Sequence, residues 1–167
     1  MDTREGARNT RQLHQHVFQE LTPTGFEYFA GHYRGENYPC LRNCMVGTAS
    51  DARVGSAPHL VQHEMDLLAS IVDRELAALD GAHAQPNVVI SRALKTLNLV
   101  IVACRIQELI FRIHPYKNGN GHMARFVIWL VCGRYGYRPR RWIVEPRPLT
   151  PLTPILLFNI ETAITNR

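Results

Sequence analysis

The sequence predicts a mainly α-helical fold built around a pair of buried helices, and two patterns carry this prediction. Apolar residues recur every three or four positions over residues 59–79, as on one face of an amphipathic helix. Residues 92–113 are apolar on nearly every side, which indicates a helix at the centre of the domain. Charged residues interrupt that second stretch too often for a membrane span, which needs about 18 consecutive apolar residues.

The N-terminal third contains one expected helix and one expected hairpin. Residues 1–10 are polar and charged, and we expect a flexible arm there. A helix pattern over residues 11–21 ends at the Thr-Pro-Thr-Gly sequence of residues 22–25, because proline and glycine interrupt helices. Residues 36–57 are rich in Gly, Asn, Ser and Ala. Within them we predict a short β-hairpin formed by Tyr38, Leu41, Met45 and Val46.

The amphipathic helix over residues 59–79 is expected to end at Asp80-Gly81. The positions that should face the core are Val61, Met65, Leu68, Val72, Leu76 and Leu79. After a proline-rich return, a last helix is expected from Ile155 to Ile164. Since we find no repeat and no second domain, residues 11–167 are interpreted as a single domain.

Composition fits a small soluble enzyme or toxin-like module. The chain has 167 residues, 46% of them apolar, which is enough for one core. Its formal net charge of +5 comes from scattered lysines and arginines, so we do not expect a nucleic-acid partner. The four cysteines form no disulfide pattern, and the first ten residues do not resemble a signal peptide. We therefore expect a cytoplasmic protein, or one delivered into another cell's cytosol, without a membrane partner.

Most of the chemical information lies in residues 114–125, His-Pro-Tyr-Lys-Asn-Gly-Asn-Gly-His-Met-Ala-Arg. Pro115 disfavours helical geometry at the preceding residue, so the central helix should end at His114. Apolar residues resume at helical spacing after Gly121 or His122, which predicts a second buried helix. The glycines permit positive φ angles and close approach of a ligand, and a helix N-terminus attracts anions. The turn is therefore expected to bind phosphates beside an imidazole.

Simpler interpretations of the same residues remain open. A His-Pro pair at a helix end is usually only a helix stop, and Gly-Asn-Gly by itself is usually a turn. His114 and His122 are also a candidate metal pair, although zinc sites need three or four ligands. The occurrence of both features between two apolar helices, with Arg125 following, favours the phosphate site.

This segment resembles the signature of the Fic family, His-x-Phe-x-Asp/Glu-Gly-Asn-Gly-Arg-x-x-Arg. The residues that match it are His114, Gly119, Asn120, Gly121 and Arg125, and Tyr116 stands in place of the phenylalanine. The resemblance extends over about residues 11–145. It implies a Fic-like helical domain, with the buried helix pair around the motif loop and the short β-hairpin as a flap.

Fic proteins mostly transfer AMP from ATP to a Ser, Thr or Tyr hydroxyl of a target protein. By position, the resemblance makes His114 the general base, a role worth about 10²–10⁴ in rate. It assigns the α- and β-phosphates to Gly119, Asn120, Gly121 and the N–H group that follows. Arg125 would hold the terminal phosphates through its planar charged fork.

Two positions depart from the signature, and both are expected to affect binding of the metal–nucleotide complex. Asn118 replaces the acidic metal ligand and would bind Mg²⁺, or Mn²⁺, through a neutral amide oxygen. His122 replaces the first arginine and is mostly neutral at pH 7 unless phosphates raise its pKa. We therefore expect weakened metal and nucleotide binding rather than a different fold.

The resemblance also implies partners. Fic relatives hold target segments as an added strand along the flap, and the candidate flap residues here are Tyr38, Leu41 and Met45. Many Fic proteins are inhibited by a helix with the motif Ser/Thr-x-x-x-Glu-Gly/Asn, but no Ser or Thr of this chain has Glu four residues later. A separate inhibitory partner, comparable to an antitoxin, is one explanation; a longer parent protein and an activity too weak to need inhibition are the others.

Three functional classes follow from these residues. The leading class is a protein adenylyltransferase with ATP as co-substrate. The second is a relative that transfers another phosphate-containing group, as Doc kinases do, and the third is a non-catalytic nucleotide-binding module. His114 favours catalysis, because a pure binding module needs no base, whereas Asn118 and His122 favour the other two classes.

Overall fold

The computed structural model describes residues 3–46 and 55–137. Its α-helices within these residues are α1 (Thr3–Arg8), α2 (Arg11–Phe18), α3 (Val61–Ala84), α4 (Arg92–Ile113) and α5 (Asn120–Arg134). Short 3₁₀ helices cover Gln19–Leu21, Glu27–Phe29 and Pro58–Leu60. The mainly helical fold predicted from the sequence is confirmed.

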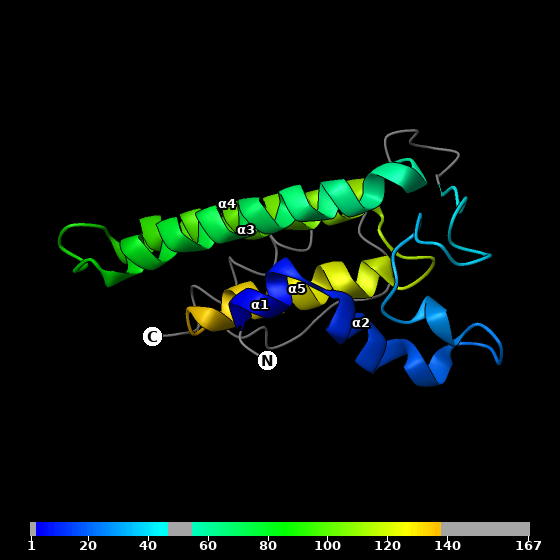
Figure 1. Ribbon diagram of the computed structural model, residues 1–167. Coiled ribbons are helices and arrows are strands. Elements are labelled where there is room, and N and C mark those ends of the chain that lie inside the picture. Colours follow the sequence, from blue (N-terminus) through cyan, green and yellow to red (C-terminus); the bar gives the residue numbers. More distant parts are fainter. Residues whose placement is uncertain (1–2, 47–54, 138–167) are drawn as a thin grey trace.

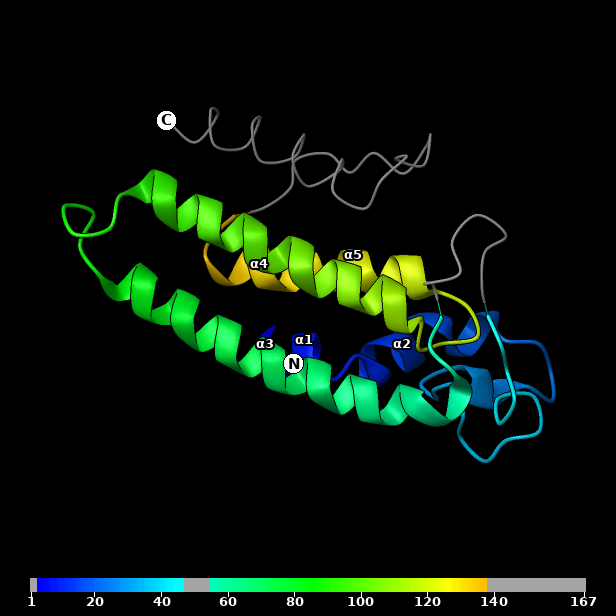
Figure 2. The same ribbon diagram turned by 90° about the horizontal axis from the view of Figure 1, so that it is seen from above.

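The helices form two layers around one core. The long helices α3 and α4 run antiparallel and side by side in one layer (Figure 2), and α1 and α5 form the other (Figure 1). Helix α4 contacts both α3 and α5, so it is the helix through which the core is continuous. The end of α4 and the start of α5 lie at the same end of the molecule, beside α2 (Figure 1).

Helix α3 carries the predicted apolar face, but it ends later than expected. All six predicted core positions are buried. The helix continues through Asp80-Gly81 to Ala84. Tertiary contacts explain the extension: Asp80 pairs with Arg134 of α5 at 2.7 Å, and Lys95 of α4 donates a 2.5 Å hydrogen bond to the carbonyl of Gln85, just beyond the helix end. These partners are distant in sequence, so local turn signals at Asp80-Gly81 do not decide the helix end.

Helix α4 has the predicted bounds, and Ser91 caps its first turn by accepting a hydrogen bond from the Leu94 N–H. Its burial is less complete than expected, because Leu94, Leu97 and Ile101 on one face stay about half exposed. The nearly continuous apolar pattern therefore overstated how central this helix is. In the part of the chain that the structure describes, no helix is long and apolar enough to cross a membrane.

The N-terminal residues differ from the flexible arm expected over residues 1–10. Residues 3–8 form α1, which contacts both α3 and α5. Ala7 is 1% exposed in the core, and Arg4 forms an ion pair with Asp73 of α3. A short polar helix is ordered here by one small apolar residue and by ion pairs, which hydrophobic periodicity does not reveal.

The predicted β-hairpin is absent from residues 36–46 and 55–57, which form turns without any strand. Hydrogen bonds within the segment are local, such as Leu41 N–H to the Tyr38 carbonyl at 3.1 Å. The remaining hairpin positions, 47–54, and the expected helix from Ile155 to Ile164 lie outside the described residues. The single-domain interpretation over residues 11–167 likewise reaches beyond them.

Candidate functional site

The candidate site is the loop from His114 to Gly119 that joins α4 to α5. His114 is the C-cap residue of α4, as Pro115 predicts, and it adopts the left-handed conformation with φ of 53°. It is the one non-glycine residue with positive φ among those that the structure describes. Such a conformation is costly for a residue with a Cβ and persists only where neighbouring contacts hold it.

The imidazole of His114 is partly buried. Its Nδ1 atom has no hydrogen-bond partner among the described residues, although it is shielded from solvent. Burial lowers the pKa of His114, and the positive charge of Arg34 lowers it further. The ring is therefore neutral at pH 7, which is the state that accepts a proton.

Asn120 shapes the loop with its side chain. Its amide accepts a hydrogen bond from the Tyr116 N–H and donates one to the Tyr116 carbonyl, both at 2.8 Å. Asn120 is buried, so this pair of hydrogen bonds closes the turn and directs the chain into α5. The backbone N–H of Asn120 lies in the first turn of α5, where a cradle built from main-chain groups would bind phosphate.

Glycine at residue 119, in the loop, and glycine at residue 121, in α5, have different structural explanations. Gly119 has φ of 78°, and a Cβ there would lie 2.6 Å from the Phe18 ring. Gly121 lies in the first turn of α5, where a Cβ would meet only Arg125 at 3.8 Å and Phe111 at 4.0 Å. The fold therefore requires glycine at residue 119 but not at residue 121, where open space remains above the helix N-terminus.

The remaining predicted nucleotide ligands lie around this N-terminus. Arg125 is one turn along α5, with Nη2 above Gly121. His122 is exposed and packs edge-on to Phe18, with 6.1 Å between ring centroids. Asn118 is exposed as well, and its Oδ1 accepts a 2.8 Å hydrogen bond from the Gly119 N–H. The fold thus brings the predicted phosphate-binding residues to one helix end, with His114 at the start of the same loop.

Asn118 is a weak fit to Mg²⁺. It offers one neutral oxygen that already accepts a hydrogen bond, whereas Mg²⁺ in proteins usually binds one or two carboxylates plus phosphates. Within residues 3–46 and 55–137 no cluster of three or more His, Cys, Asp or Glu is arranged to hold a metal ion. An ion at this loop would therefore take most of its ligands from nucleotide phosphates and water.

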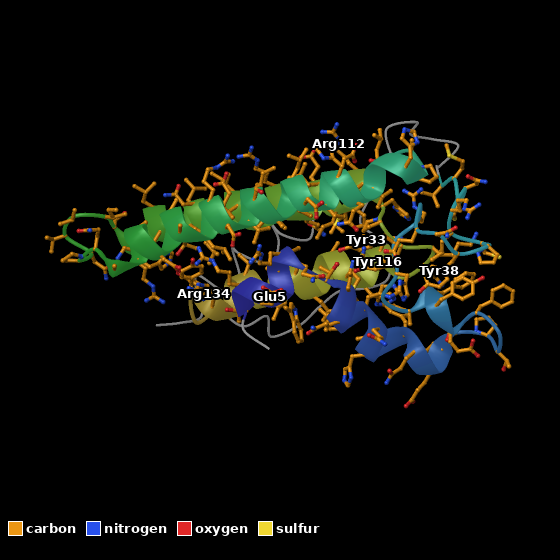
Figure 3. The ribbon with its side chains drawn as sticks, in the orientation of Figure 1. Glu5, Tyr33, Tyr38, Arg112, Tyr116 and Arg134 are labelled. Carbon is orange, nitrogen blue, oxygen red and sulfur yellow. The ribbon has the colours of Figure 1, made fainter. Side chains whose placement is uncertain are left out.

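The three candidate flap residues are not equivalent. Leu41 is fully buried, with 0% exposure, so its side chain belongs to the packing and is not available to a target. Met45 is 69% exposed, and Tyr38 stacks on Tyr28 with ring centroids 4.8 Å apart. Tyr38 lies at the outer end of the molecule, beyond the closely packed Tyr33 and Tyr116 (Figure 3).

His14 of α2 is a site residue that sequence analysis missed. It is buried between Tyr116 and Phe18, with ring centroids 3.7 Å and 4.6 Å away. Its Nδ1 accepts a hydrogen bond from the Gly31 N–H, so the proton of the neutral ring is on Nε2, which bonds the Asn118 carbonyl at 3.1 Å. His14 therefore holds the loop between α4 and α5 through the main chain of Asn118. Its sequence signal is the Leu13-His14 pair within the helix pattern of residues 11–21, which resembles the first helix of Fic proteins but does not by itself assign a contact with the loop.

Comparison with known proteins gives one family. No curated protein and no solved structure matches the chain. The Fic/DOC family model matches residues 7–132, a span that includes α2, the 20–46 segment, α3, α4 and most of α5. Members of this family are commonly transferases. Since that match covers well over half of the sequence and includes the loop between α4 and α5, the chain belongs to the Fic/DOC family.

Proposed function

We propose that this protein transfers AMP from ATP to a Ser, Thr or Tyr hydroxyl of a target protein. His114 is the general base, and the first turn of α5 with Arg125 holds the phosphates. The observation that carries the proposal is a neutral, partly buried imidazole at one end of a loop whose other end is an open helix N-terminus. A phosphate-transfer reaction needs both a proton acceptor and an anion site.

Gly121 supports a ligand at the helix end. Glycine within a helix costs about 0.5–1 kcal/mol relative to alanine. The packing of this protein gives no reason for that cost, because a Cβ at residue 121 would make only ordinary contacts. The open space at Gly121 lets a phosphate approach the backbone N–H groups of the first turn, and the helix dipole adds to its binding.

The proposed step is an in-line displacement at the α-phosphorus. The target hydroxyl oxygen forms the new P–O bond, and its proton passes to the imidazole of His114. The bond from the α-phosphorus to the oxygen that bridges to the β-phosphate breaks, and pyrophosphate leaves. Arg125 stabilises the charge on the departing phosphates through its guanidinium. A bound Mg²⁺ would supply further neutralisation of those phosphates, with Asn118 as its protein ligand.

The test is transfer of radiolabel to protein in a cell lysate, with α-labelled or γ-labelled ATP and either Mg²⁺ or Mn²⁺. Relative to lysate without the protein, whose own kinases use the γ-phosphate, we expect added label from the α position and none from the γ position. His114→Ala should reduce the transfer by about 10²–10⁴, as for loss of a general base. His63→Ala is the matched control, since His63 is exposed on α3, and it should transfer at the parental rate.

Other outcomes distinguish the alternatives. Label from the γ position alone would overturn AMP transfer in favour of phosphate transfer. Absence of both labels, with ATP binding still measurable by calorimetry, would overturn it in favour of a binding module. Equal transfer by His114→Ala and the parent would remove His114 from the role of base.

A further inference from the structure

The last turn of α4, which carries His114, is held by hydrogen bonds from a segment far away in sequence. The Gly55 N–H donates to the Arg112 carbonyl at 2.8 Å, and the Ser56 N–H donates to the Ile113 carbonyl at 3.1 Å. The Arg34 N–H donates to the Pro115 carbonyl at 2.8 Å. Carbonyl groups at a helix C-terminus lack partners within the helix, so these bonds satisfy groups that would otherwise need water.

The side chain of Arg34 completes this arrangement. It is 1% exposed, and its Nε donates to the His114 carbonyl at 2.6 Å. The Nη2 group donates to the Ile113 carbonyl at 2.9 Å and to the Ser56 carbonyl at 3.1 Å. The Nη1 group donates to the Cys44 carbonyl at 2.7 Å. The planar guanidinium is the side chain that can direct several N–H groups to separate acceptors in a fixed fork.

The four carbonyls belong to three parts of the chain. Two are at the end of α4, and the other two, those of Cys44 and Ser56, lie at separate points within residues 36–57, where the sequence predicts the flap. Gly35, next to Arg34, is packed so closely that a Cβ there would lie 1.9 Å from the Pro58 carbonyl oxygen. The chain at Arg34 and Gly35 therefore packs tightly against the start of the Pro58–Leu60 turn, while Arg34 itself bonds the end of α4.

We propose that Arg34 is the positioning residue of the site: it fixes His114 in its left-handed conformation and joins the base to the flap segment through the carbonyls of Cys44 and Ser56. The role in catalysis rests on the proposed function, whereas the role in geometry does not. A strained residue needs contacts that overdetermine it, and Arg34 with Gly55 and Ser56 supplies them. Arg34 touches no substrate in this role and acts only through His114.

Two substitutions separate the charge of Arg34 from its fork. Arg34→Lys keeps the positive charge but cannot span four carbonyls with one ammonium group. Arg34→Gln removes the charge as well. Arg112→Gln is the matched control, because Arg112 is exposed at the same helix end and its side chain points outward (Figure 3). Thermal unfolding monitored by circular dichroism establishes which variants fold.

The first measurement does not depend on activity. Histidine titration by NMR, without nucleotide, should show a higher His114 pKa in Arg34→Gln than in the parent, because the nearby positive charge is gone. The Arg112→Gln control should titrate like the parent. Amide exchange at Gly55 and Ser56 should be faster in both Arg34 variants, since the segment loses its anchor. An unchanged His114 pKa in Arg34→Gln together with unchanged exchange would overturn the proposal.

The second measurement is the transfer rate. A displacement near 1 Å can cost about 10²-fold in rate. We therefore expect kcat to fall by about 10²-fold in Arg34→Lys, with KM for ATP within about twofold of the parent, because the phosphate site on α5 is untouched. A folded Arg34→Lys with parental kcat would overturn the positioning role. If the parent itself transfers no label, the titration and exchange results still decide the geometric role of Arg34.

Discussion

At the scale of single residues, His14 shows how a buried polar group holds the motif loop. Its ring bonds to Gly31 on one side and to Asn118 on the other, so both nitrogens of the neutral ring have partners. Burial lowers the pKa of His14 from 6.5 to about 4, although the hydrogen bond with the Asn118 carbonyl acts in the opposite direction. The folded protein therefore needs a neutral His14.

This pKa predicts a pH dependence of stability. Between pH 6.5 and pH 4 the unfolded chain binds a proton at His14 that the folded chain does not, so the free energy of unfolding falls as the pH falls. The shift corresponds to at most on the order of 3 kcal/mol at 1.36 kcal/mol per pH unit. His14→Gln should lose this part of the dependence, as measured by urea unfolding across the pH range.

His16 provides the control, because it is exposed on the same helix. His16→Gln should unfold with the pH dependence of the parent. Parallel stability curves for the parent and His14→Gln would show that His14 is already protonated, or solvated, in the folded state.

At the scale of elements, the apolar periodicity of α3 matches the side of the helix that is buried in the core. Leu68 is 1% exposed in the core, whereas the neighbouring Leu67 is 51% exposed. The two leucines differ only in which side of the helix they occupy, so they form a natural pair for comparison.

Leu68→Ala should therefore lower the free energy of unfolding by about 2–5 kcal/mol, through lost burial and the cavity left behind. Leu67→Ala should change it by less than about 0.5 kcal/mol. Chemical denaturation of both variants measures the difference. Similar losses for the two would mean that α3 has a different orientation in the fold.

At the scale of the whole molecule, α1 packs against α5 within its own layer and against α3 of the other layer. Arg134 of α5 pairs with Asp80 of α3 and also donates a hydrogen bond to Thr3, while Arg4 pairs with Asp73. Figure 3 shows α1, with Glu5, beside the end of α5 that carries Arg134. Most of these ion pairs are exposed and individually weak, so we attribute the docking of α1 mainly to the burial of Ala7.

The docking of α1 is tested by placing glutamine at two neighbouring positions, one buried and one exposed. Ala7→Gln places a large polar side chain where the structure has no space, and it should destabilise the fold by about 1–3 kcal/mol. Arg8→Gln, at the exposed neighbouring position, should change stability by less than about 0.5 kcal/mol. Equal melting temperatures of the two variants would support the flexible arm that the sequence predicts.

The elements predicted correctly are those decided by neighbouring residues. The bounds of α4, the buried face of α3 and the start of α5 follow from apolar spacing and from Pro115 and Gly119. The loop between α4 and α5 is located for the same reason, since proline fixes its own φ angle and glycine permits the positive φ angles that turns use.

The elements that were missed depend on partners far away in sequence. The hairpin prediction rested on composition, yet residues 36–46 form turns in which Leu41 is buried. The extension of α3 depends on Arg134 and Lys95, and α1 depends on a core that other helices supply. Periodicity within one segment contains no information about these contacts.

By itself, the sequence determined the helical class, the position of the candidate site and the residues at its centre, because these depend on spacing within about twenty residues. Only the tertiary structure decided what holds that site. His14 and Arg34 reach the loop across 104 and 80 residues of chain, through hydrogen bonds to main-chain carbonyls. A carbonyl group is present at every residue, so no pattern of side chains marks the one that a distant histidine or arginine will bind.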